Sequence, residues 1–239
     1  MRVFIAGASG AIGRRLMPLL REAGHDITGM TRSADVAREL EAGSVHAVVV
    51  DVYDPEALTR AVVAARPEVV MHQLTDLPRE LVDDAQLAAA YPLNARIRIE
   101  GTRNLVAAAN AASARRFIVQ SAAFAYLPGK EPYVETDPLN LVDGPRLVTV
   151  KAAADMEQQV LNSGMEPVVL RYGLLYGPGT WSEGPTRKPP VHVDAAAQAA
   201  VLALTGKPGV YNIADDEGTV SIEKARREWG FDPDFRLAS

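Results

Sequence analysis

Six short apolar runs rich in β-branched residues recur along the chain, and segments of helix-forming composition separate them. The runs cover residues 2–8, 26–31, 46–51, 68–74, 116–122 and 167–173. The helical segments cover residues 11–23, 34–42, 55–65, 93–112 and 148–163. Short apolar runs are typical of buried parallel strands, and parallel neighbours need a long crossover, usually a helix. The alternation therefore predicts an α/β fold with a doubly wound parallel sheet and helices on both of its faces.

The length of the chain, 239 residues, predicts one domain with a single sizeable core. The one long irregular segment is rich in proline and glycine and covers residues 176–190, and a further strand is expected at 209–214. We therefore expect a single domain, 1–239, in which residues 1–173 form a dinucleotide-binding core. Residues 174–239 would form a small C-terminal portion, a reduced substrate lobe.

Composition excludes several classes of function. The formal net charge is −5, and no basic stripe favours nucleic acid or an anionic membrane. The chain has no cysteine, which excludes disulfides, thiolate metal sites and cysteine nucleophiles. It shows neither a leader-like start nor an apolar run of membrane-spanning length. We expect a cytoplasmic protein that binds no metal ion, no nucleic acid and no membrane.

A glycine-rich turn, IAGASGAIGRRL, joins the first expected strand to the first expected helix. Glycines at such a turn let the backbone approach a pyrophosphate, and the start of the helix supplies free N–H groups. A turn that only packs the helix on the strand is the alternative, but the order strand, turn, helix favours a Rossmann-like, NAD(P)-binding site. The residues expected at the cofactor here are Gly7, Ser9, Gly10, Ala11, Ile12 and Gly13.

The residues after the second strand indicate which nucleotide is bound. An acidic residue there accepts hydrogen bonds from the ribose hydroxyls of NAD, whereas an arginine suits the 2′-phosphate of NADP. This chain has Thr31, Arg32 and Ser33 at that place. NADP is therefore the predicted cofactor and NAD the less favoured one, with a solvated arginine as the alternative interpretation. Asp51 and Val52, after the third strand, are expected near the adenine.

Together these residues resemble the short-chain dehydrogenase/reductase superfamily, in particular its extended branch of epimerases and dehydratases. The resemblance runs through GASGAIG, GTRNLVAAA, LRYGLLYGPG and VHVDAAAQAA. It implies a nicotinamide cofactor and a Ser/Thr, a Tyr and a Lys that act together on a carbonyl or alcohol. It also implies that Gln73, Leu74, Thr75 and Tyr172 lie along the cofactor.

The helix expected at 148–163 departs from the family's Tyr-x-x-x-Lys pattern. When Lys151 is matched to the family's lysine, Leu147 stands where the tyrosine would be. In the family, the lysine lowers the pKa of the tyrosine so that its phenol can pass a proton. The hydroxyl residue is also displaced, since Ala122 takes its position and Ser121 comes one residue earlier. We take Lys151, Ser121 and Tyr126 as the candidate catalytic residues, with Lys151 also at the cofactor.

Two functions stay open on this pattern. The chain is either an atypical NADP-dependent oxidoreductase or isomerase of a small carbonyl or alcohol, or a catalytically inactive NADP(H)-binding sensor or interaction protein. In the first case a proton could also come from Tyr133, Asp137 or His192, although packing is the favoured role for His192. A small-molecule substrate is expected, because only residues 180–190 remain where the family's enzymes grip a nucleotide-sugar. The resemblance also allows a homodimer through the helices at 93–112 and 148–163.

Overall fold

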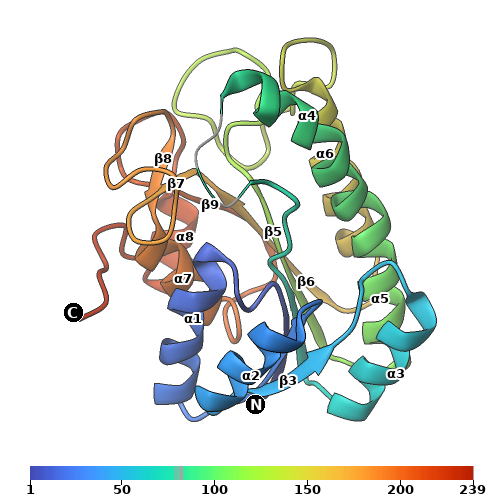
Figure 1. The fold of residues 1–239 in the computed structure, drawn as a ribbon. Helices are drawn as coiled ribbons and strands as arrows, with labels where there is room; N and C mark the ends of the chain where they lie inside the picture. The colour runs from blue at the N-terminus through green and yellow to red at the C-terminus, as the bar shows by residue number, and fades with distance from the viewer. Residues whose placement is uncertain (79, 81–82, 239) are drawn as a thin grey trace.

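The protein is described here by a computed structural model that covers residues 1–78, 80 and 83–238. Its centre is a seven-stranded parallel sheet in the order β3-β2-β1-β4-β5-β6-β9 (Figure 1). The strands are β1 (Arg2–Ala6), β2 (Asp26–Thr31), β3 (His46–Val49), β4 (Val69–His72), β5 (Arg116–Ala122), β6 (Glu166–Tyr172) and β9 (Gly209–Ile213). The predicted doubly wound α/β fold is confirmed.

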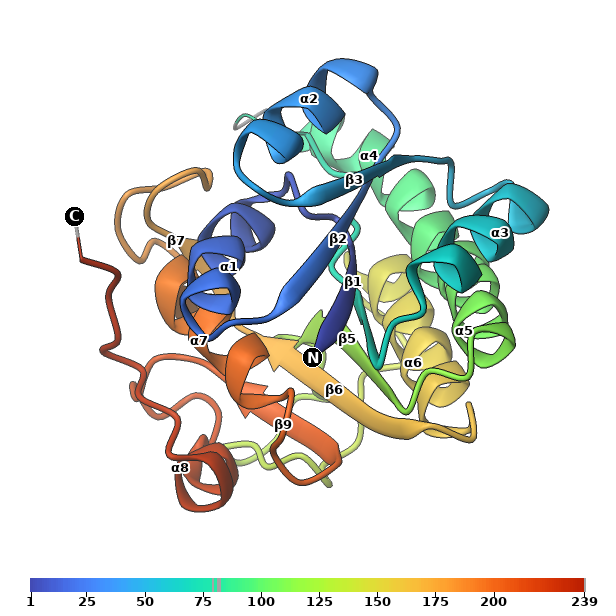
Figure 2. The ribbon, with the colours of Figure 1, turned by 90° about the horizontal axis from the view of Figure 1, so that it is seen from below.

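Helices cover both faces of the sheet (Figures 1 and 2). One face carries α1 (Ala11–Glu22), α2 (Ala34–Ala42) and α7 (Val193–Leu202). The other carries α3 (Pro55–Ala65), α4 (Asp84–Arg96), α5 (Thr102–Ala111) and α6 (Leu147–Leu161). Because both faces are covered, the strand residues on both sides are apolar, and Val3, Phe4 and Ile5 of β1 are at most 1% exposed.

The predicted helix at 93–112 is longer than expected and is not a regular α-helix. It begins as α4 at Asp84, where Asp83 and Gln86 form a reciprocal capping box. It then passes through a π-helical turn, η1 (Ile97–Gly101), before it continues as α5. Such a turn contains one extra residue, and it is frequently found at functional sites. Here it carries Arg98, which is buried.

The residues after 174 extend the same sheet. Strand β9 pairs with β6, and α7 packs against α1. Asp194 of α7 forms an ion pair with Arg15 of α1, with 2.5 Å between the closest atoms. The short strands β7 (Leu174–Tyr176) and β8 (Pro190–His192) pair with each other, and α8 (Glu223–Trp229) packs beside β9. The C-terminal portion therefore shares the core of the domain.

Two surface features bear on partners. Leu93, Ile99, Val148 and Leu161 are exposed on α4, η1 and α6, where the resemblance places a homodimer interface, and the homodimer stays a prediction. In the part of the chain that the structure describes, no helix combines the length and the apolar character needed to cross a bilayer.

Candidate functional site

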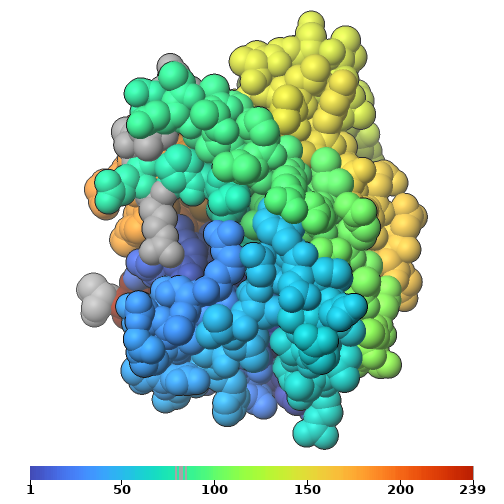
Figure 3. All heavy atoms as spheres, turned by 45° about the vertical axis from the view of Figure 1, so that its right-hand side comes forward, coloured from blue at the N-terminus to red at the C-terminus, as the bar shows by residue number. Residues whose placement is uncertain are grey.

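A cavity of about 930 Å³ opens at the carboxyl ends of the strands. It lies where the strand order reverses between β1 and β4, which is the usual ligand site of a doubly wound sheet. Figure 3 shows the surface hollowed between the blue residues of α1 and α2 and the green residues of α4. The glycine-rich loop forms one end of the cavity, and α4, α6 and the segment 173–187 form the other.

The glycine-rich loop has the geometry of a phosphate cradle. Gly7 adopts a φ of +99°, and a Cβ there would lie 2.6 Å from the carbonyl carbon of Gln73. Gly10 precedes α1 without a side-chain cap, so the first N–H groups of the helix face the cavity free of a capping side chain. A Cβ on Gly13 would meet the carbonyl oxygen of Gly7 at 2.4 Å, so this glycine lets α1 pack under the loop.

The predicted loop residues fall into two groups, those that line the cavity and those that lie behind its wall. Gly7, Ser9, Gly10 and Ala11 line the cavity. Ile12 and Gly13 do not: Ile12 is 4% exposed and belongs to the apolar core, and Gly13 supports the loop from below. These two residues act on the cofactor site through packing.

The end of β2 forms the next part of the wall. Thr31, Arg32 and Ser33, which are expected at the cofactor from the sequence, all line the cavity. Arg32 is exposed, and no carboxylate of the described residues lies within 4 Å of its guanidinium. Val52 also lines the cavity, but Asp51 does not; its carboxylate accepts a hydrogen bond from the Tyr53 backbone at 2.9 Å.

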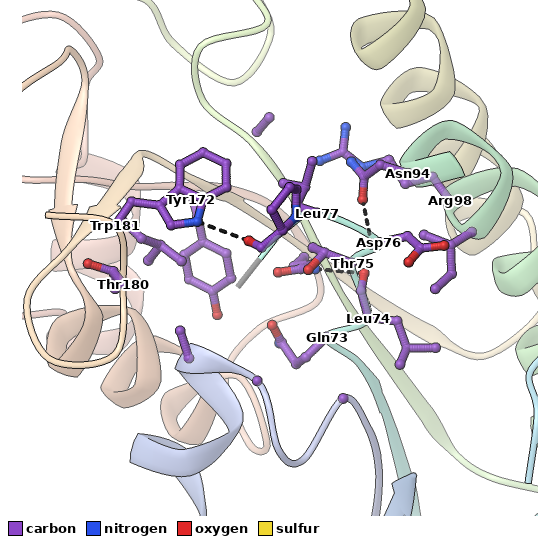
Figure 4. A pocket seen from close by; sticks show the side chains of 18 of the residues that line it. Gln73, Leu74, Thr75, Asp76, Leu77, Asn94, Arg98, Tyr172, Thr180 and Trp181 are labelled. Carbon is purple, nitrogen blue, oxygen red and sulfur yellow. Dashed lines mark hydrogen bonds between the residues drawn. The ribbon is translucent and has the colours of Figure 1, made fainter. Parts of the chain in front are cut away.

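Polar side chains without partners line the middle of the cavity. The segment Gln73, Leu74 and Thr75 runs between Tyr172 and Trp181 on one side and Asn94 and Arg98 on the other (Figure 4). Gln73 is 6% exposed, and its side-chain oxygen and nitrogen both lack a hydrogen-bond partner among the described residues. Buried polar groups are normally paired, so these atoms are suited to a polar ligand.

The side of α6 that faces the cavity differs from the sequence expectation. Lys151 is exposed and, like Leu147, is absent from the cavity wall. The residue of α6 that lines the cavity is Thr149, which is 6% exposed and whose hydroxyl oxygen has no partner among the described residues. This placement gives Lys151 no direct contact with the cavity.

The other two catalytic candidates belong to a buried polar network. Ser121 lines the cavity, but its hydroxyl donates to Glu157 at 2.5 Å. Glu157 in turn accepts two hydrogen bonds from Arg171, at 3.0 and 2.7 Å. Tyr126 is not in the cavity wall; its hydroxyl donates to Asn212 at 2.6 Å, and burial raises the pKa of its phenol.

The remaining proton donors considered from the sequence also lie outside the cavity wall. Tyr133 stacks on Tyr126, and the carboxylate of Asp137 accepts a hydrogen bond from the backbone of Val134. His192 caps α7, where its ring accepts a hydrogen bond from the N–H of Asp194 at 3.1 Å. No group of three or more potential metal ligands occurs within the described ranges.

Comparison with known proteins identifies the family. The model of the NAD-dependent epimerase/dehydratase family matches residues 3–234. The chain belongs to this family. It is 43% identical, over 91% of its own length and 77% of the relative's, to a 3-diazoavenalumate denitrifying reductase of a Streptomyces species. A nicotinamide dinucleotide is the cofactor of this family, and the cradle at Gly7 and the unpaired Gln73 fit such a group.

Solved structures of the family share the fold. UDP-glucose 4-epimerase of Thermotoga maritima, crystallised with UDP-glucose, superposes with a TM-score of 0.81 at 18% identity, covering 99% of this chain and 94% of that one. UDP-glucose 4-epimerase of Thermus thermophilus in complex with NAD has a TM-score of 0.72 at 24% identity, covering 100% and 86%. At these identities the likeness concerns the fold.

The cavity of this family member is rich in positive charge. Among the described residues, five arginines line it, against a single carboxylate, Asp76. Arg14 and Arg32 lie toward the glycine-rich loop and β2, whereas three further arginines lie toward α4, α6 and the segment 173–187; they are Arg98, Arg146 and Arg187. None of these three arginines was among the residues that the sequence predicts for the site.

Arg98 is held by the π-helical turn. It is 7% exposed and donates to the backbone carbonyl of Thr149 at 3.1 Å, which ties η1 to the start of α6. Burial lowers the pKa of Arg98 to about 10, so the side chain keeps its charge at neutral pH. Complete burial, with a smaller contribution from the Arg98 cation, lowers the pKa of His72 to about 3, which keeps that imidazole neutral.

Aromatic and aliphatic side chains complete the cavity wall at the end formed by α4, α6 and the segment 173–187. Leu77, Tyr91, Phe124 and Trp181 line it, together with Leu87 and Thr180. The indole N–H of Trp181 donates to the backbone carbonyl of Pro78 at 3.0 Å, which fixes the ring (Figure 4). Sequence patterns missed these residues because they come from loops and from α4, and only the tertiary fold brings them together.

Proposed function

We propose that the chain is an NADPH-dependent reductase that transfers a hydride to a small aromatic diazo compound, whose nitrogen leaves as N₂. One observation carries the proposal: α6 and the end of β5 present Thr149 and Ala122 to the cavity, and neither is an acid or base at neutral pH. The site therefore suits a reduction that needs no proton from the protein.

Reductive loss of a diazo group is such a reaction. When a hydride attacks the aromatic carbon of a diazonium group, its electron pair forms the new C–H bond. The pair of the C–N bond leaves with the nitrogen, so the products are the arene and N₂ and no proton is exchanged. The family relationship supports this reaction class, since the relative at 43% identity is named a denitrifying reductase of a diazo compound.

Reduction of a carbonyl is less well supported by the site. The new oxyanion would need a proton donor within hydrogen-bonding reach. Two phenols line the cavity. Burial raises the pKa of the Tyr172 phenol, and its hydroxyl donates to the carbonyl of Ala196 at 3.1 Å, whereas Tyr91 lies on α4, at the end of the cavity away from the glycine-rich loop.

The proposed cofactor is NADPH, whose dihydronicotinamide supplies the hydride. Arg32 and Arg14 line the end of the cavity beside β2 and the glycine-rich loop, and an arginine there suits a 2′-phosphate. The unpaired Gln73 amide and Thr149 hydroxyl would orient the polar groups of the bound cofactor. Trp181 would exclude water from the reacting carbon, and fixed positioning of this kind accelerates transfer.

The test follows the hydride itself. Purified protein is incubated with 4-carboxybenzenediazonium and NADPH that carries deuterium at either the pro-R or the pro-S position. We expect benzoate labelled with one deuterium at the carbon that lost nitrogen, from one of the two labelled forms alone, since only a protein site selects a face. A reaction without protein measures the background.

A parallel incubation with 4-formylbenzoate tests carbonyl reduction. Turnover of the aldehyde without acceleration of the diazo probe above background would contradict the proposal. Cofactor binding without turnover of either probe would also contradict it and favour a sensor.

A further inference from the structure

Arg146 and Arg187 line the end of the cavity formed by α4, α6 and the segment 173–187. No carboxylate of the described residues lies within 4 Å of either guanidinium. Burial lowers the pKa of the Arg146 guanidinium, the neighbouring Tyr91 phenol raises it, and the positive charge of Arg187, which lines the same end of the cavity, lowers it further. A half-buried cation next to a second cation raises the free energy of the folded protein unless an anion binds close to both.

The fold holds Arg146 in place without neutralising it. The residue immediately precedes α6, and its guanidinium lies over the ring of Phe124, 4.6 Å from the centroid. A cation over an aromatic ring is attracted by the ring and does not need its N–H groups for this contact. The side chain is therefore held at the cavity wall with N–H groups that can bind an anion.

The surroundings indicate what carries the anion. Phe124, Trp181 and Tyr91 line the same end of the cavity, with Leu77 and Leu87 beside them. Aromatic and aliphatic walls suit a flat, conjugated body, and a guanidinium fork matches a carboxylate through two parallel hydrogen bonds.

We propose that Arg146, assisted by Arg187, binds a carboxylate of the substrate, so that the enzyme acts on planar aromatic or conjugated carboxylates. This inference rests on the proposed function for the identity of the reaction, but binding of the carboxylate does not require turnover. The anion site would orient the flat substrate with its other end toward Thr149 and the cofactor.

The test measures binding of a substrate-like acid that cannot react. Cinnamate and its uncharged methyl ester are titrated into the NADP⁺-loaded protein by calorimetry, for the wild type and for Arg146→Met, Arg146→Lys and Arg103→Met. Methionine keeps much of the length and apolar bulk of the side chain but removes its charge. Arg103 is an exposed arginine outside the cavity wall and serves as the matched control.

We expect cinnamate to bind the wild type at least about 10-fold more tightly than the ester. The Arg146→Met variant should bind cinnamate about 10- to 100-fold more weakly than the wild type does, which is the range for loss of a charged hydrogen bond. Arg146→Lys should keep part of this affinity, and the ester should be insensitive to all three changes. NADP⁺ affinity checks that each variant folds.

Equal binding of acid and ester, or equal loss in Arg146→Met and Arg103→Met, would overturn the inference. UDP-glucose binding that depends on Arg146, without cinnamate binding, would also overturn it, because the site would then serve a diphosphate. Cinnamate binding that depends on Arg146 in a protein without turnover would uphold the anion site and refute only the proposed reaction.

Discussion

At the scale of single residues, the structure gives Ser121 a structural role. Its hydroxyl donates to Glu157, which is held by two hydrogen bonds from Arg171, and the two charged side chains are 6% and 7% exposed. Glu157 and Arg171 connect α6 to β6, and Ser121 adds β5. A hydroxyl already committed to a buried carboxylate is a poor proton donor to a substrate.

This arrangement predicts a loss of stability on substitution. Glu157→Gln should lower the free energy of unfolding by about 3–5 kcal/mol, because it leaves a buried guanidinium without its counter-charge. Ser121→Ala should cost about 1–2 kcal/mol, since Arg171 still binds the carboxylate. Denaturant unfolding measures both, with Glu183→Gln as an exposed control. A loss of turnover in Ser121→Ala at unchanged stability would instead support a catalytic role.

At the scale of elements, the sequence predicted the strands and most helices because each has a clear period and clear end signals. At the start of α3, for example, Asp54 is the N-cap and Pro55 the first helical residue, and both residue types are typical of these positions. Helix α7 was missed because the residues VDAAAQAAVL are apolar on nearly all sides, which hides the amphipathic period. The start of α4 was missed because Pro92 interrupts the helical pattern.

In the site too, the residues with a clear local sequence pattern could be predicted and the others could not. The glycine-rich loop and the residues after β2 and β4 could be predicted because parallel strands place their carboxyl ends at one edge. The face of α6 could not, since a shift of two residues turns a side chain from the cavity to solvent, as it does between Thr149 and Lys151. Arg146, Arg187 and Trp181 come from irregular segments whose positions no local pattern determines.

The packing of α1 under its loop yields a second prediction. Gly13→Ala would place a methyl group 2.4 Å from the carbonyl oxygens of Gly7 and Ala8, so the helix or the loop must move. We expect a loss of about 1–3 kcal/mol in unfolding free energy, the usual cost of overpacking, together with weaker cofactor binding. Gly184→Ala, where the added carbon meets no atom within 4 Å, is the control. Unchanged cofactor affinity in Gly13→Ala would contradict this account of the loop.

At the scale of the whole molecule, the cavity and the remaining surface carry opposite charge. The chain has a net charge of −5, yet five arginines and one carboxylate line the cavity in the part of the chain that the structure describes. Such a contrast draws anionic ligands toward one opening and repels them elsewhere. It also makes the affinity for phosphorylated cofactors depend on ionic strength.

NADPH binding should show this dependence. Raising the ionic strength from about 0.01 to 0.15 M shortens the screening length from about 30 to 8 Å and should weaken NADPH binding more than NADH binding. Arg32→Ala should weaken NADPH binding by about 10- to 100-fold and leave NADH binding nearly unchanged. Arg38→Ala is the matched control, because Arg38 lies on α2, pairs with Asp35 and is not in the cavity wall. Equal affinity for both cofactors in the wild type would refute the preference for NADP.

The fixed indole of Trp181 also makes the site optically accessible. The chain contains two tryptophans; Trp181 lies in the cavity wall, whereas Trp229 packs on Tyr211, with ring centroids 3.6 Å apart. A Trp229→Phe variant therefore carries one tryptophan, which can be excited selectively over the tyrosines, and this tryptophan is positioned beside the proposed substrate. Its emission would report in real time the arrival of the cofactor and of the acid, without a label and without turnover.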